Sequence, residues 1–326
     1  MIYYVIVSTG KIMKVKFIVI ILIFCCFFLP SCSINKMAMN AVSDMLAGGG
    51  SSDVFTGDSD PELVGDAIPF AIKLYETLLA ANPTHQGLML TTGSLFVMYA
   101  NAYVQGPAEM LPSYEWETRE AEMQRAKSLY LRGYEILYNA MELKYRGFKQ
   151  AASNMDTLQS FLKKFKKEDV GLIYWAVAGG LSAYSIDIMD FELSGRIQEW
   201  NAMIHRAYEL DPDFGGATLD EFFVIFYSAL PELMGGDIER AKYHFNLTLE
   251  KTKGNSAGVY VSYAHSICVP AQDYDTFEDC LLKALAVDVN ADTSTRLVNI
   301  ISQRKARWLL DNAWTLFSFL PIPDDY

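Results

Sequence analysis

Residues 60–108 contain the pattern that decides the fold: DPELVGDAIPFAIKLYETLLAANPTHQGLMLTTGSLFVMYANAYVQGPA. The first half carries charged side chains, and its apolar residues recur every three or four positions, as in an amphipathic helix. Asp60 and Pro61 supply an N-cap and a proline at the first helical position, and Asn82-Pro83 ends the helix. From Gln86 onward the segment contains no charged residue. We therefore predict a one-sided, charge-bearing helix followed by a helix without charge on any face.

Further signals fix the expected faces and starts of the helices. Two capping-box sequences, at residues 218–221 (TLDE) and 275–278 (DTFE), predict later helix starts. The first helix is expected to bury one apolar stripe, which is made of Leu63, Ala67, Phe70, Ala71, Leu74, Leu78 and Ala81.

Four segments lack Asp, Glu, Lys and Arg altogether, and each follows a charged, one-sided helix. They are residues 86–108, 170–186, 222–231 and 254–272. A helix with no charge on any face is either buried or spans a membrane. Glycines interrupt several of the segments, and two are shorter than the roughly 20 residues of a bilayer crossing. We therefore expect buried inner helices that amphipathic outer helices surround.

Paired helices of this kind suggest a helical repeat. The tetratricopeptide pattern Ala-x₃-aromatic occurs at Ala71, Ala126 and Ala241, and degenerate copies begin at Trp200 and Phe277. The spacing between these matches is irregular. The expected fold is all-α, a divergent tetratricopeptide-like α-solenoid bundle of about four to five helix pairs in a single domain over residues 60–326.

Residues 1–31 have the character of a secretory signal peptide. They contain three lysines and no acidic residue, and an apolar run of residues 17–29 leads to Cys32. Residues 29–32 (LPSC) resemble the lipobox of bacterial lipoproteins, which predicts lipid attachment at Cys32. The alternative is that Cys32 is merely a third cysteine beside Cys25 and Cys26. Met13 is an alternative translation start.

Residues 32–59 are expected to form a tether between the lipid and the folded domain. The tether would hold a short helix at residues 34–46 and a Gly/Ser/Asp loop. The expected location is a periplasm-facing membrane surface, with the outer membrane favoured over the inner. Removal of the leader changes the net charge from −12 to −15, so an anionic phosphate backbone is not an expected partner.

No catalytic or cofactor motif is present, so neither an enzyme nor a cofactor is expected. The sequence lacks G-x-G-x-x-G, a P-loop, H-E-x-x-H, C-x-x-C and G-x-S-x-G. His244 and His265 could approach each other, but two histidines without further ligands make a poor metal site, and none is predicted. Cys268 and Cys280 are interpreted as buried thiols, with a disulfide between them as the alternative.

The charge-free segments are rich in aromatic residues. Inner helices of a curved repeat line its concave side, and an apolar wall with a few hydroxyls suits a ligand site. Core packing is the alternative reading of the same residues. The candidate lining residues are Tyr99, Tyr103, Trp175, Phe226, Tyr227 and Tyr263. Arg304, Lys305 and Arg307 could meet a carboxylate or form a solvated face.

Several stretches together resemble one family, the T component associated with tripartite ATP-independent periplasmic (TRAP) transporters. These stretches are residues 60–64 (DPELV), 71–76 (AIKLYE), 227–231 (YSALP), 235–241 (GGDIERA), 244–245 (HF), 260–264 (YVSYA), 283–286 (KALA) and 303–310 (QRKARWLL). The resemblance covers nearly all of the chain after the leader.

The resemblance implies a tetratricopeptide-like lipoprotein that faces the periplasm and assembles as a homotrimer. It also implies a hydrophobic pore or cavity in each protomer and docking of the transporter's solute-binding P component. The implied cargo is hydrophobic, with a carboxylated molecule as one candidate. The alternative function is a scaffold in the cell envelope that binds other proteins and takes no small ligand.

The predicted anchor has a direct test. Replacement of Cys32 by Ala should release the protein from membranes, because the leader would no longer leave a lipidated cysteine. Fractionation and incorporation of labelled fatty acid measure the effect, and Cys26→Ala is the control that should remain anchored. Label still incorporated into the Cys32→Ala protein would contradict the assignment.

Overall fold

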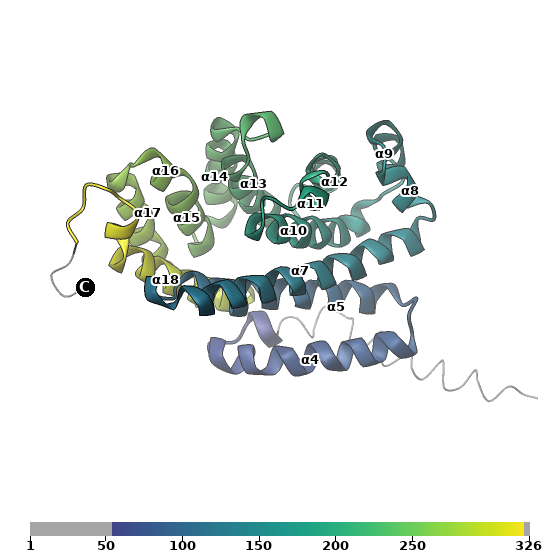
Figure 1. The fold of residues 1–326 in the computed structure, drawn as a ribbon, viewed down its shortest axis with the longest axis horizontal. Coiled ribbons are helices and arrows are strands. Elements are labelled where there is room, and N and C mark those ends of the chain that lie inside the picture. The colour runs from purple at the N-terminus through teal and green to yellow at the C-terminus, as the bar shows by residue number, and fades with distance from the viewer. Residues whose placement is uncertain (1–53, 323–326) are drawn as a thin grey trace, which may run out of the picture.

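The computed structural model describes residues 54–322, and every regular element in that range is helical (Figure 1). This confirms the expected all-α class. The leader, Cys32 and most of the expected tether lie outside the described residues. The first half of the fold contains α4 (Pro61–Ala81), α5 (Gln86–Tyr99), α6 (Gly106–Glu109), α7 (Trp116–Lys144), α8 (Phe148–Ala152), α9 (Met155–Leu162), α10 (Val170–Ile186), α11 (Phe191–Ser194) and α12 (Ile197–Leu210).

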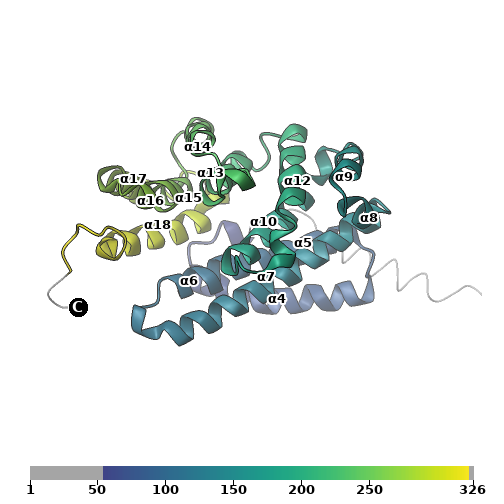
Figure 2. The ribbon, with the colours of Figure 1, turned by 45° about the horizontal axis from the view of Figure 1, so that its top comes forward.

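The second half contains α13 (Thr218–Ala229), α14 (Ile238–Thr252), α15 (Ala257–Tyr263), α16 (Val269–Ala271), α17 (Tyr274–Ala286) and α18 (Arg296–Asp311). The long helices α4, α5 and α7 lie along one another, and α10 packs on α7 (Figures 1 and 2). The π-helices η1 (Ala100–Gln105) and η5 (Ala264–Cys268) continue α5 and α15. Short 3₁₀ turns occur at Ser113–Glu115, Lys167–Asp169, Glu232–Met234, Thr293–Thr295 and Ala313–Thr315.

Helix α4 begins as predicted but buries a different face. Asp60 Oδ1 accepts a hydrogen bond from the Leu63 amide at 3.0 Å, and Pro61 follows the cap. The buried residues are Val64, Ile68, Ile72 and Tyr75. Of the predicted stripe, Leu63, Phe70 and Leu74 are 59%, 74% and 40% exposed. The predicted apolar stripe was wrong by one residue, which corresponds to a rotation of about 100° around the helix axis. The error arises because α4 is apolar on two adjacent faces.

Neither predicted capping box forms. Helix α13 is preceded by Ala217, and the Thr218 hydroxyl donates to the Gly215 carbonyl at 3.1 Å instead of capping the helix. Helix α17 begins earlier than predicted, because Asp273 caps it by accepting from the Thr276 amide at 3.1 Å. In both cases an upstream residue takes the cap position.

The charge-free segments correspond to α5–η1–α6, α10, most of α13, and α15–η5–α16. Helix α5 packs between α4 and α7, and α10 packs between α7 and α12. Within residues 54–322 no helix combines the length and apolar character needed to cross a membrane. These segments contribute buried residues such as Leu88, Ile173 and Phe223, although Ile225 of α13 is 47% exposed.

Helix α7 lies deeper than its charged sequence suggested, because α5 and α10 both pack against it at glycines. A Cβ on Gly133 would lie 2.7 Å from the Gly93 carbonyl oxygen of α5. A Cβ on Gly179 of α10 would lie 3.0 Å from Val97 and 3.3 Å from the Tyr130 carbonyl oxygen. The backbones of α5 and α7 therefore approach more closely than a Cβ would allow, and α10 lies so close to them that a Cβ on Gly179 would be crowded.

The residues of the tetratricopeptide-like matches are placed at helix contacts. Ala126, Ala241, Trp200 and Phe277, which begin four of the five matches, are fully buried. Helices that are neighbours in sequence pack together, including α4 with α5, α13 with α14 and α17 with α18. The arrangement of these pairs as a repeat stays a prediction.

The last long helix returns to the first. Leu297 of α18 belongs to the same apolar cluster as Val64 and Ile68 of α4. The Arg304 guanidinium makes two contacts with the Glu62 carboxylate, although the two residues are 242 positions apart. Helix α18 thereby joins the two ends of the described chain.

The glycine contacts predict opposite effects for two similar substitutions. Gly133→Ala should lower the free energy of unfolding by about 1–3 kcal/mol, because α5 must move away from α7. Gly258→Ala should be neutral or add up to ~1 kcal/mol of stability, because its Cβ would make only ordinary contacts, with Ser302 Oγ at 3.4 Å and Ser256 Oγ at 3.9 Å. Urea unfolding measures both values. Equal stability of Gly133→Ala and the wild type would contradict the close packing.

Candidate ligand-binding interior

Two of the six candidate lining residues pack near α4. The rings of Tyr99 and Tyr103 stack with centroids 5.9 Å apart. Tyr103 covers Gly65 of α4, where a Cβ would lie 2.7 Å from its ring. Burial raises the pKa of Tyr103 to about 12. Both tyrosines are partly exposed, and Tyr103 fills the contact between η1 and α4.

Two other candidates, Phe226 and Tyr227 of α13, are 4% and 5% exposed. Phe226 stacks on Phe222 with ring centroids 5.8 Å apart. The Tyr227 hydroxyl lies 3.3 Å from His205 Nε2, and Arg240 donates to it at 3.5 Å. These two rings join α13 to α12 and α14.

The remaining candidates, Trp175 and Tyr263, are partly exposed and lie on different helices. Trp175 of α10 contacts Tyr174, with ring centroids 5.0 Å apart. Tyr263 of α15 packs on Phe245 of α14 at 4.2 Å between centroids. The largest apolar cluster contains or contacts five of the six candidates, and Tyr103 packs against a separate cluster with α4.

The two π-helices were not predicted. π-Helical turns are rare and are frequent at functional sites. η1 and η5 each interrupt a charge-free helix, and each leads into a short helix with proline near its start, Pro107 in α6 and Pro270 in α16. The shared signal in the sequence is Tyr-Ala followed by Pro-Ala, at residues 99–108 and 263–271.

A chain of polar side chains connects the first and last parts of the fold. The Tyr130 hydroxyl donates to Gln105 Oε1 at 2.6 Å, and Gln105 Nε2 donates to Glu109 Oε1 at 2.7 Å. Lys305 of α18 donates to Glu109 Oε2 at 2.7 Å. Burial opposes ionisation of Glu109, but Lys305 outweighs it and keeps the pKa of Glu109 below its usual value. The charges of Lys305 and Glu109 therefore neutralise each other.

His265 of η5 lies close to this pair. Its side chain is exposed to solvent, yet burial by the surrounding protein, followed by the charge of Lys305, lowers its pKa. Arg304 and Lys305, which could have met a ligand carboxylate, instead pair with Glu62 and Glu109 of the chain itself.

A second polar group, Glu221, lies beside a run of aromatic rings. Tyr174 contacts Trp175 at 5.0 Å, Phe214 at 5.8 Å and Phe222 at 6.1 Å between ring centroids. All four rings are partly exposed. The carboxylate of Glu221 accepts a hydrogen bond from Ser256 at 2.6 Å. Apolar rings with a few polar groups are suited to binding an amphipathic ligand.

The neighbouring carboxylate, Asp220, is part of a buried network that fixes α13. It is fully buried and accepts from His244 Nδ1 at 2.7 Å and from the Tyr208 hydroxyl at 3.0 Å. Lys251 Nζ lies 2.8 Å from its other oxygen. Burial opposes ionisation, but hydrogen bonds from His244, Lys251 and Tyr208 outweigh it and lower the pKa of Asp220.

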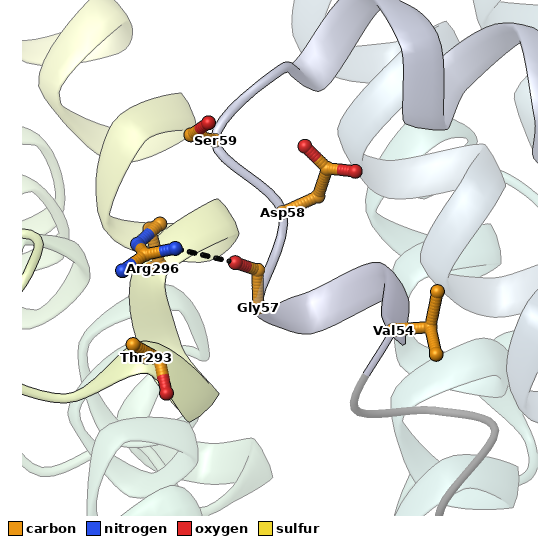
Figure 3. Close-up of a pocket in the computed structure, with 6 residues that line it drawn as sticks. All are labelled: Val54, Gly57, Asp58, Ser59, Thr293 and Arg296. Carbon is orange, nitrogen blue, oxygen red and sulfur yellow. Dashed lines mark hydrogen bonds between the residues drawn. The ribbon is translucent and has the colours of Figure 1, made fainter.

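Open pockets also occur on the surface. One of about 540 Å³ lies between the turn before α4 and the start of α18. Figure 3 shows Arg296 directed at the Gly57 carbonyl, to which its Nη1 donates at 2.9 Å, with Asp58, Ser59 and Thr293 around them. Another pocket, of about 460 Å³, lies beside Tyr227 and is lined by Glu232, Asp237 and Glu239. The first pocket is lined mainly by polar groups, whereas the second is lined by polar and apolar groups in about equal measure.

The described residues contain no group of three or more His, Cys, Asp or Glu side chains that could hold a metal ion. His244 pairs with Asp220, whereas His265 lies near Lys305 and Glu109. Cys268 and Cys280 are both buried free thiols.

Residues 54–322 thus form an all-helical protein in which charge-free, aromatic-rich helices pack against charge-bearing helices. The sequence matches the TRAP transporter T-component family over residues 57–317. It is 32% identical over 305 residues to an uncharacterized protein of Treponema pallidum (strain Nichols), a match that covers 87% of this chain and 94% of that protein. The chain therefore belongs to the TRAP transporter T-component family.

This membership confirms the resemblance seen in the sequence. The family comprises accessory components of TRAP transporters and is not known for enzymatic activity. Membership implies association with components of a TRAP transporter.

The Asp220 network predicts a loss of stability when one partner is removed. Asp220→Asn should lower the free energy of unfolding by about 3 kcal/mol, since it leaves Lys251 and His244 without the buried charge. Asp213→Asn is the control; Asp213 pairs with the same lysine at 2.9 Å but is 76% exposed, so its effect should stay within about 0.5 kcal/mol. Chemical denaturation at neutral pH measures both, and equal effects would contradict the role of burial.

The same carboxylate predicts a pH dependence. Because the pKa of Asp220 is lower in the folded than in the unfolded chain, the folded state binds fewer protons. The resulting stability is complete above about pH 4, the pKa region of an unfolded aspartate, and is lost as the pH falls through the lower folded value. The wild type should therefore lose more stability on acidification than Asp220→Asn. Parallel pH profiles would contradict this.

Proposed function

We propose that this protein is a lipid-anchored, periplasm-facing accessory component of a TRAP-type transport system that binds a hydrophobic or amphipathic ligand in its interior. The observation that carries the proposal is the partial exposure of aromatic side chains on helices that bear no charge. Tyr174, Trp175 and Phe222 present apolar surface that a stable core would otherwise cover. Family membership supports the transport role.

The finer parts of the proposal follow from the resemblance. The helix pairs form a divergent tetratricopeptide-like repeat, and each protomer of a homotrimer encloses a hydrophobic pore or cavity. Among the candidate lining residues, the partly exposed Tyr99, Trp175 and Tyr263 are suited to contact a ligand directly. Phe226 and Tyr227 are buried behind them, and Tyr103 supports the wall from the α4 side. Cys32 carries the lipid, and the solute-binding P component docks on the protein.

A scaffold without a small ligand is the second candidate function, and a separate observation favours it. Leu63, Phe70 and Leu74 form an exposed apolar stripe on α4, and Leu233 is 98% exposed in the turn between α13 and α14. Exposed apolar patches mark sites where proteins associate. A protein that docks partners there and has a filled interior would bind no alkyl ligand.

Substitution of Trp175 separates the two functions. Trp175→Ala should reduce the amount of apolar small molecule that co-purifies with the protein by about tenfold, equivalent to ~1.4 kcal/mol of binding free energy. Native mass spectrometry and solvent extraction measure the retained molecule. Trp116→Ala is the matched control, because Trp116 is 64% exposed at the start of α7. Circular dichroism checks that both variants remain folded.

Two outcomes would contradict the ligand-binding function. One is that the wild type retains no small molecule under any purification condition. The other is that folded Trp175→Ala retains as much as Trp116→Ala. Capture of the P component by the full-length protein, and its loss on substitution of Leu63 or Phe70, would then favour the scaffold.

A further inference from the structure

The interior contains one carboxylate that the protein leaves without a counter-charge. Glu221, in the first turn of α13, is partly exposed, and its carboxylate accepts a hydrogen bond from the neutral Ser256 hydroxyl at 2.6 Å. Among the described residues, no Lys, Arg or His nitrogen lies within 4.0 Å of its carboxylate. Burial, with the charge of Asp220 as a further cause, raises the pKa of Glu221. An ionised carboxylate in this position is therefore short of stabilising partners.

Other carboxylates of the interior differ from Glu221 because each has a cation beside it. Asp220, one residue earlier, is neutralised by Lys251 and hydrogen-bonded by His244. Glu109 is neutralised by Lys305 at 2.7 Å. Lys305, the cation near His265, is therefore already paired with Glu109, whereas Glu221 is bound by the neutral Ser256 hydroxyl. The unpaired negative charge of Glu221 therefore favours a positively charged ligand over a carboxylate ligand.

Aromatic rings surround the same place. Glu221 precedes Phe222, whose ring centroid lies 6.1 Å from that of Tyr174, and the ring centroid of Phe214 lies 5.8 Å from that of Tyr174. Burial and then the negative charge of Glu221 raise the pKa of Tyr174, so the carboxylate and this ring are neighbours. Aromatic faces attract cations through their quadrupole and are the usual surroundings of a bound organic ammonium group.

We propose that Glu221, with Tyr174, Phe222 and Phe214, binds the ammonium group of an amphipathic ligand whose apolar part lies along the charge-free helices. This inference rests on the proposed function, because it assigns the polar end of the same ligand. The ammonium group supplies the counter-charge that Glu221 lacks, and the hydroxyl of Ser256 keeps one carboxylate oxygen in place. The net charge of −12 favours approach of a cation.

The test compares three ligands that share a chain and differ in charge. Octyltrimethylammonium, octanoate and 1-octanol, each below its micelle concentration, are titrated into the wild-type protein by calorimetry. The cation should bind about tenfold more tightly than the alcohol, and octanoate should bind more weakly than either. A tighter affinity for octanoate, or equal affinities for all three, would overturn the proposal.

Variants assign the preference to the site. Glu221→Gln, which keeps an acceptor for Ser256, should reduce the cation's affinity to about that of the alcohol without changing the alcohol's affinity. Tyr174→Leu should weaken the cation more than the alcohol. Glu192→Gln, at an exposed carboxylate on α11, is the control and should change neither. A preserved cation preference in folded Glu221→Gln would overturn the assignment.

The outcomes separate this inference from the function on which it rests. Binding of the alcohol and octanoate without a preference for the cation overturns only the ammonium site. Absence of binding by all three ligands overturns the apolar ligand function as well, and with it the ammonium site.

Discussion

The fold depends on the close approach of three helix backbones. Gly93, Gly133 and Gly179 remove the side chains that would hold α5, α7 and α10 apart. Helix α7 can then lie between two charge-free helices although its own sequence is charged, and its apolar face is covered on both sides. The remaining helices add to this packed unit, and α18 returns to α4 through Leu297, Arg304 and Glu62. Tyr99 on α5 and Tyr174 and Trp175 on α10 are carried by this frame.

Much of the architecture could be predicted from the sequence because the absence of charge is a strong signal. Residues 170–186, for example, contain no charged residue, and α10 buries Ile173, Ala176, Val177 and Ala183 in the core. Helical periodicity and capping sequences predicted the buried faces and the starts of the helices less well. The two apolar faces of α4 differ by one residue, so periodicity alone could not choose Val64 over Leu63. The capping boxes failed because Asp273 and Ala217 precede the predicted caps. The π-helices and the contact of α18 with α4 depend on tertiary packing, which no local pattern encodes.

The candidate site was proposed from composition, and its geometry could not be read from the sequence. The aromatic residues of the charge-free segments stay candidates for a ligand site, and the structure divides them between partly exposed rings such as Trp175 and buried rings such as Phe226. The polar groups were not predicted, because the hydrogen-bond partners of Gln105, Glu109 and Glu221 lie far along the chain. Where water is excluded, an ionised carboxylate without a cation beside it is much less stable than one that is paired. Which interior charges are paired is therefore a better guide to the charge of a ligand than the number of aromatic residues is.

The central claim is that the charge-free helices bind the ligand inside the protein. Photo-crosslinking with an alkyl diazirine, followed by mass-spectrometric mapping of the labelled residues, tests it most directly. The account predicts labels on α10, α13 and α15, at or near Trp175, Phe222 and Tyr263. Labels confined to the exposed stripe of α4, at Leu63, Phe70 and Leu74, would contradict it.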